Sequence, residues 1–126
     1  MNKIVSLLLY CILYAILNVA GAAIIKHHLV GKALLSFSDW LKFLLQVPVI
    51  LAFFLIFLSA LTMFKALSAG NFSATIPIAT GINFTLTVLA GYFLFKDHIG
   101  IQTIFGFILI ISGIFIISLN QIDHAK

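Results

Sequence analysis

Five polar side chains interrupt long apolar stretches of this sequence and are the residues best suited to chemistry. They are Tyr14, Asn18, Thr80, Asn83 and Thr87. Their amide and hydroxyl groups donate and accept hydrogen bonds without carrying charge. Inside a bilayer such groups turn toward other helices or a water-filled cavity. We expect them to line a pathway for a polar substrate. The alternative interpretation is that they tie helices together, at about 1 kcal/mol or less each.

No residue pattern predicts catalysis, and no catalytic residue or cofactor is expected. The sequence has no nucleophile beside a base and no phosphate-binding loop. His27 and His28 are adjacent, so they point in different directions, and no acidic or cysteine ligands accompany them. No metal site is therefore expected. The single cysteine, Cys11, excludes an intrachain disulfide. These observations argue against an enzyme.

The composition indicates that lipid is the solvent for most of the chain. Of its 126 residues, 63% are hydrophobic and 8% are charged, against roughly one quarter charged in soluble domains. The formal net charge is +4, but the lysines stand singly at the ends of apolar runs, where their side chains reach the headgroup layer. A nucleic-acid partner is not expected. Lys26, Lys65 and Lys96 are candidate interfacial cations for an anionic substrate.

The apolar runs must be the elements that position these side chains. Each is about as long as a helix that crosses a bilayer. The sequence predicts an all-α membrane protein, one transmembrane domain over 1–126 with four helices in a compact, dimeric bundle. The first helix is expected to be an uncleaved anchor, and Ser38 is expected to cap the second, with Asp39 at its positive end. The expected spans are 4–25, 41–65, 72–95 and 101–119.

Small and polar residues share faces on three of these helices. Tyr14 and Asn18 lie on one face of the first helix, and Thr80, Asn83 and Thr87 on one face of the third. In the fourth, Gly106 and Gly113 are seven residues apart. Such a glycine groove lets another helix approach closely. We expect Gly106 and Gly113 to pack against a helix, most simply at a dimer seam.

Two segments resemble the drug/metabolite transporter superfamily. The segment from Ala90 to Ile114 looks like its closing hairpin, with Asp97, Gly106 and Gly113 on the acidic and glycine positions. The segment Leu17-Asn-Val-Ala-Gly-Ala-Ala-Ile-Ile-Lys26 is similar to the first helix of four-helix members, which include small multidrug resistance exporters and aminoarabinose-lipid flippase subunits. The resemblance implies an EamA-like or small multidrug resistance-like protein, multi-pass in a bacterial inner membrane.

Within the superfamily, the residues resemble the flippase subunits more than the proton-coupled drug exporters. Those exporters carry a glutamate where this chain has Asn18, and aromatic residues where it has Ile76 and Ala79. A cation site without a carboxylate or an aromatic box has little to bind with. The flippase subunits also lack that glutamate. The resemblance therefore implies transport of an anionic or sugar-bearing lipid, or of a small polar metabolite.

Three functions remain open from the sequence. The first is a transporter or flippase subunit that acts as a homodimer, or as a heterodimer with a related small membrane protein, on a substrate such as a lipid-linked sugar. The second is a multidrug exporter that works without the usual glutamate. The third is a non-transport accessory subunit of a membrane complex. Orientation stays undetermined, because Lys3, Lys65 and Lys126 face one side and Lys26, Lys32, Lys42 and Lys96 the other.

Overall fold

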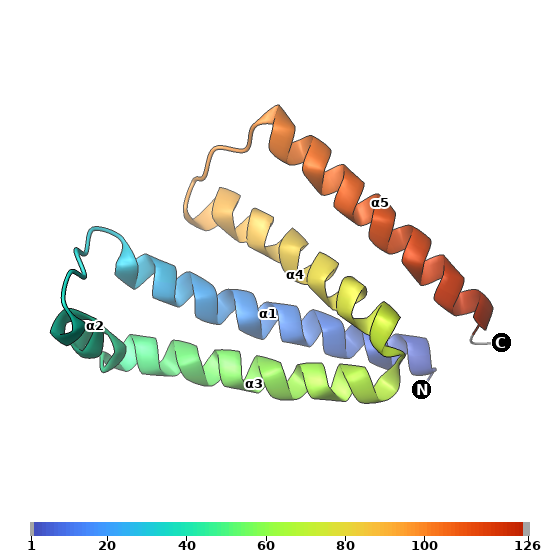
Figure 1. Cartoon of the computed structure of the whole chain (residues 1–126), viewed down its shortest axis with the longest axis horizontal. Coiled ribbons are helices and arrows are strands. Elements are labelled where there is room, and N and C mark those ends of the chain that lie inside the picture. The colour runs from blue at the N-terminus through green and yellow to red at the C-terminus, as the bar shows by residue number, and fades with distance from the viewer. Residues whose placement is uncertain (1, 125–126) are drawn as a thin grey trace.

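The computed structural model describes residues 2–124, with side chains as far as Asn120, and every regular element in that range is a helix (Figure 1). The predicted all-α class is confirmed. Lys126, expected on the same side of the membrane as Lys3 and Lys65, lies outside the described residues. The helices are α1 (Lys3–Leu29), α2 (Phe37–Leu44), α3 (Val47–Ala69), α4 (Phe72–Leu94) and α5 (Ile101–His124).

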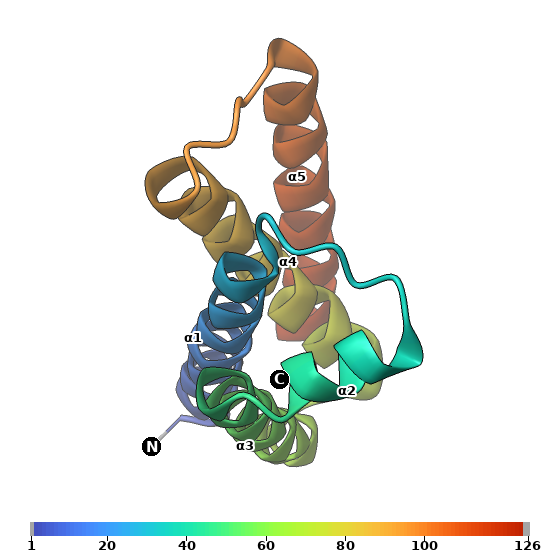
Figure 2. The ribbon, with the colours of Figure 1, turned by 90° about the vertical axis from the view of Figure 1, so that its left-hand side faces the viewer.

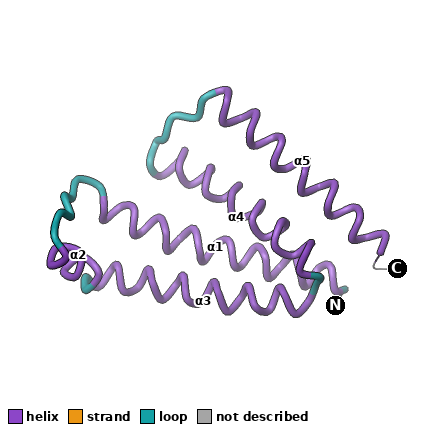
Figure 3. The backbone as a smooth tube through the Cα atoms, viewed as in Figure 1, coloured by secondary structure: helices purple, strands orange, loops and turns teal. Residues whose placement is uncertain are grey.

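Four of the helices are long and apolar enough to cross a membrane: α1, α3, α4 and the Ile101–Asn120 part of α5. Successive long helices run in opposite directions, as Figure 1 shows. The connections are short (Figure 3). Gly70 ends α3, and the carbonyl of Asn71 accepts from the N–H groups of Ala74 and Thr75 to begin α4. This tight turn reverses the chain, so that α4 runs back in the opposite direction to α3 and packs mainly on α1 and α5.

The common core lies where α1, α3 and α4 meet, and it is made largely of small residues. α1 packs most extensively on α3 and next on α4. Gly21 allows the close contact with α3, because a Cβ there would lie 2.8 Å from the carbonyl oxygen of Ala52. Small residues let membrane helices approach closely, where dispersion contacts replace a hydrophobic drive. The buried core residues are Leu7, Cys11, Ala66, Ala74, Ile78 and Ala79.

The second membrane helix begins later than the expected Leu41. Residues 37–44 form the separate helix α2, and α3 starts at Val47. Pro48 explains the break, since it has no N–H for the carbonyl of Leu44 and its ring would clash with that carbonyl in a continuous helix. The expected cap is also displaced: Ser36, not Ser38, caps α2, whereas Asp39 does lie in the first turn.

Helix α5 stands apart from the other three long helices (Figure 2). Among the described elements it contacts α4 alone. A Cβ at Gly81 would collide with the side chain of Ile114, and the rings of Phe84 and Phe107 stack with centroids 5.9 Å apart. None of residues 101–120 is buried. The four long helices are therefore a three-helix core with a fourth helix attached along one side.

Candidate functional site

Two asparagines join α1 to α4 within the apolar part of the chain. The amide nitrogen Nδ2 of Asn18 donates to Oδ1 of Asn83 at 3.0 Å, and both side chains are partly buried. The partners are 65 residues apart in sequence. The packing of α1 on α4 therefore brings together two of the predicted pathway residues as a neutral, directly hydrogen-bonded pair.

The other predicted polar residues surround this pair unequally. Tyr14 lies one turn from Asn18 and packs against the core. The Thr87 hydroxyl donates to the carbonyl of Asn83 at 2.8 Å, and its side chain remains exposed. Thr80 is exposed as well. The structure thus brings Tyr14, Asn18, Asn83 and Thr87 to one region, with Thr80 at its edge.

The exposure of Thr80 and Thr87 follows from how α4 is held. One side of α4 meets α1 through Asn83, and another meets α5 through Gly81 and Phe84. At about 100° per residue, Thr80 and Thr87 fall between these two contacts. Since α5 does not touch α1, this polar strip of α4 is uncovered. Measured along the axis of α4 from Thr80 to Gly91, this strip is about 16 Å long at 1.5 Å per residue.

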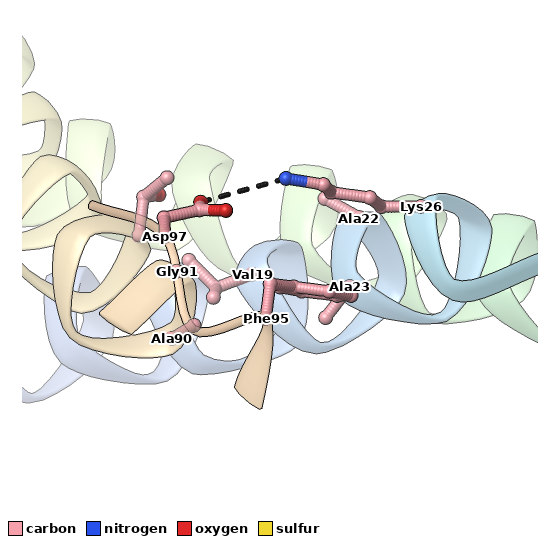
Figure 4. Close-up of a pocket in the computed structure, with 9 residues that line it drawn as sticks. Val19, Ala22, Ala23, Lys26, Ala90, Gly91, Phe95 and Asp97 are labelled. Atoms are coloured by element: carbon pink, nitrogen blue, oxygen red, sulfur yellow. Dashed lines mark hydrogen bonds and ion pairs between the residues drawn. The ribbon is translucent and has the colours of Figure 1, made fainter. Parts of the chain in front are cut away.

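A small cavity of about 120 Å³ opens at one end of the strip, between α1 and α4 (Figure 4). Its walls are mostly apolar, and its polar groups are a threonine hydroxyl and an opposed lysine and aspartate. The volume suits water or a small group rather than a whole drug-sized ligand. The lining residues are Val19, Ala22, Ala23, Lys26, Thr87, Ala90, Gly91, Phe95 and Asp97.

The end of α4 positions Asp97 at this cavity. Lys96 adopts a left-handed conformation (φ 55°) and reverses the chain, so that the N–H of Asp97 donates to the carbonyl of Gly91 at 2.9 Å. Gly91 has no side chain to block this return, and a Cβ there would lie 2.8 Å from Asp97 Oδ2. The carboxylate consequently faces Lys26 of α1.

Lys26 and Asp97 form an ion pair across the mouth of the cavity. Lys26 Nζ lies 3.5 Å from Asp97 Oδ2 and 4.7 Å from the ring centre of Phe95. Both charged side chains are about half exposed (51%), so the pair contributes at most about 1 kcal/mol. Such a weak pair can open for a competing anion. Of the other predicted cations, Lys96 is exposed nearby, whereas Lys65 is exposed near the opposite end of the bundle.

The two α5 glycines have open space where a side chain would project. A Cβ at Gly106 or Gly113 would meet nothing within 4 Å. In the described part of the chain, no three His, Cys, Asp or Glu side chains gather in a way that could hold a metal.

Sequence reasoning missed Phe95 and Asp97 as partners of Lys26. The small residues that make room there were the available signal: Ala22, Ala23, Ala90 and Gly91.

Comparison with known proteins yields no match: no protein-family model, curated protein or solved structure is significantly similar to the chain. The resemblance to the drug/metabolite transporters stays an interpretation of the residues quoted above. The geometry of the polar pair and of the cavity is therefore the basis for any functional argument.

Proposed function

We propose that the chain is a transporter or flippase subunit of a bacterial inner membrane. Its substrate would be an anionic or sugar-bearing lipid, or a small polar metabolite. The observation that carries the proposal is the Asn18–Asn83 pair, 3.0 Å apart between two helices long enough to span a bilayer. Polar side chains at such positions are costly in lipid and commonly mark substrate pathways.

The surroundings of the pair support movement of a polar headgroup. The Asn18–Asn83 pair adjoins the uncovered strip of Thr80 and Thr87, and the strip leads to the cavity at Lys26. Amide and hydroxyl groups can replace the water around a sugar. Lys26 can exchange its half-exposed carboxylate partner for a phosphate, because both present charged oxygens that accept hydrogen bonds from an ammonium group.

A single chain leaves this route open on one side, and the proposal therefore includes a second subunit. The route lies between α1 and α5, which do not contact each other. A second copy, or a related small membrane protein, would supply the missing wall. A single bundle of four helices packs its interior with its own side chains.

Reconstitution of the purified chain in vesicles, with and without any partner encoded beside it, tests this function. The probe is a polyprenyl-phosphate sugar with a fluorophore that an impermeant reductant bleaches in the outer leaflet. We expect protein-dependent bleaching beyond the outer-leaflet fraction. Asn18→Ala and Asn83→Ala should each slow it severalfold while lowering stability by only about 0.6 kcal/mol, the average for interhelical polar contacts in membranes.

Asn120→Ala is the matched control, because Asn120 is an exposed amide on α5 away from the pair. It should leave the rate unchanged. Equal rates for the parent, Asn18→Ala and Asn83→Ala would show that the pair only ties α1 to α4. Absence of movement for lipid-linked sugars and for polar metabolites, with every partner combination, would contradict the transport function itself.

A further inference from the structure

The short helix α2 presents an apolar face that the described chain does not cover. Among the described helices it contacts α3 alone, and Phe43 is its one buried residue. The neighbouring face is exposed and large. Its members, with exposed fractions, are Phe37 (84%), Trp40 (46%), Leu41 (48%) and Leu44 (39%). A continuous apolar surface of this kind marks an interaction site.

The opposite face of α2 is polar, so the helix is strongly amphipathic. At about 100° per residue, Ser38, Asp39 and Lys42 fall together on the side away from Phe37 and Leu41. Asp39 is already engaged, because its carboxylate accepts the backbone N–H of Ser36 at 3.2 Å. Lys42 is exposed. This arrangement is typical of helices that lie in a membrane interface.

The placement of α2 agrees with that interface. Figure 1 shows α2 nearly end-on while α1 and α3 run lengthwise, and Figure 2 shows the reverse, so α2 lies crosswise to the spans. It begins eight residues after α1 ends and stops three residues before α3 starts. Both connections hold it at the level where two apolar spans end, which is where the acyl chains meet the headgroups.

Charge near α2 favours an anionic surface. Four lysines and two aspartates belong to this end of the bundle: Lys26, Lys32, Lys42, Lys96, Asp39 and Asp97. Lys32 folds back over α2, with Nζ 3.1 Å from Gln46 Oε1 and 5.3 Å from the ring centre of Phe43. Its charge therefore stays beside the helix, where Lys42 adds a second.

We propose that α2 is a membrane-surface helix that docks into the boundary between acyl chains and headgroups. Phe37, Trp40 and Leu41 enter the acyl layer, and Lys32 and Lys42 face the phosphates of anionic phospholipids. The inference rests on the membrane location proposed above, and it is independent of what the protein transports. The occupant of the uncovered face is thus the bilayer itself, not a second protein.

The test uses Trp40, the only tryptophan of the chain, as a native depth probe. The full chain is reconstituted in vesicles of equal parts zwitterionic and anionic phospholipid. Lipids brominated near the headgroup or near the bilayer centre are then compared with the aqueous quencher acrylamide. We expect strongest quenching by shallow bromines and little by acrylamide. Strong acrylamide quenching without bromine quenching would mean a solvated helix, and strongest quenching by central bromines a buried span.

Protection from bromines and acrylamide alike would mean that a protein covers the face, and this result would also overturn the proposal. Flotation after a high-salt wash separates the two proposals: a chain that does not float with the vesicles contradicts membrane spanning, whereas a floating chain with a solvated Trp40 contradicts only the docking of α2.

Paired lysine variants test the choice of lipid. We expect Trp40 of the parent to be better protected from acrylamide in anionic than in purely zwitterionic vesicles. Lys32→Gln with Lys42→Gln should abolish this difference, because each lysine near an anionic surface adds attraction. Lys65→Gln, an exposed lysine near the other end of the bundle, should preserve it. A difference that survives in the double variant would refute the role of these lysines.

Discussion

Ser36 and Asp39 decide where α2 begins. The hydroxyl of Ser36 accepts the N–H of Asp39, and the carboxylate of Asp39 accepts the N–H of Ser36, both at 3.2 Å. This reciprocal pair satisfies two backbone donors that a helix start leaves open. An eight-residue helix has little cooperativity of its own. The capping pair is therefore a substantial part of what keeps α2 helical.

We predict that α2 loosens in acid through Asp39. Hydrogen bonds from Ser36, first its side chain and then its backbone, hold the pKa of Asp39 below the ordinary value. A lowered pKa stabilises the folded helix above the unfolded value of about 3.9, and this stabilisation is lost as pH falls through the lower folded pKa. Trp40 emission should accordingly shift toward that of an exposed indole in strongly acidic buffer.

Asp39→Asn should remove this acid transition, because an amide does not titrate in this range. Asp97→Asn is the control, since Asp97 belongs to the α4–α5 connection and faces Lys26. It should leave the Trp40 transition in place. An acid transition of the same size in Asp39→Asn would assign the effect to another group.

At the level of the helices, the most extensive contact is between α1 and α3. It includes Gly21, where an added Cβ would lie 2.7 Å from Ile56 Cγ1 and 2.8 Å from the carbonyl oxygen of Ala52. A side chain can rotate away, but a helix carbonyl cannot move without the helix. This contact therefore resists even one added methyl group.

Gly21→Ala should destabilise the fold by about 1–3 kcal/mol, the usual cost of overpacking. Gly113→Ala is the matched control, because a Cβ at Gly113 meets nothing within 4 Å and alanine favours a helix over glycine by about 1 kcal/mol. Denaturation of both variants in detergent micelles, at concentrations that keep the chain monomeric, measures the difference. Equal losses for the two variants would contradict the close packing of α1 on α3.

The number and type of the long helices could be predicted from the sequence, because apolar length alone distinguishes a span. The start of the second span could not. Apolar residues continue across Leu44, Leu45 and Val47, so composition does not reveal the break between α2 and α3. Pro48 causes this break through the backbone hydrogen bond that it cannot make. The expected span 41–65 therefore includes the second half of α2 and leaves out the first half.

The candidate site could likewise be predicted from the sequence only in part. Asn18 and Asn83 stand out in the sequence, because amides are rare in apolar runs. Their mutual hydrogen bond depends on how far α1 slides along α4, which no local pattern encodes. The Lys26–Asp97 pair joins residues 71 apart. It depends further on the left-handed turn at Lys96, a conformation that few lysines adopt.

For the molecule as a whole, α5 is the long helix that the rest of the described chain covers least. It touches α4 alone, none of its described side chains is buried, and both of its glycines are open. At Gly21 and Gly81, by contrast, atoms of neighbouring helices in the same chain occupy the space where a Cβ would lie. Gly106 and Gly113 therefore remain candidates for packing against a second subunit.

We predict that Gly106→Ile with Gly113→Ile weakens self-association at least roughly tenfold, equivalent to about 1.4 kcal/mol. Energy transfer between labelled chains, measured over a series of lipid-to-protein ratios, detects the change. Gly100→Ile is the control, an equally open glycine just before α5. If the double variant associates as strongly as the parent, the dimer seam lies elsewhere. If the parent does not self-associate at all, the homodimer is contradicted and the heterodimer remains.

The neutrality of the Asn18–Asn83 pair has a consequence for energetics. Neither amide binds or releases a proton in the physiological range. A substrate that passes this point would not be exchanged for protons there, and it would neutralise no fixed charge. The direction of net movement would then follow the concentrations on the two sides of the membrane and, for an anionic substrate, the membrane potential. Reactions that supply the substrate on one face or consume it on the other would set that direction.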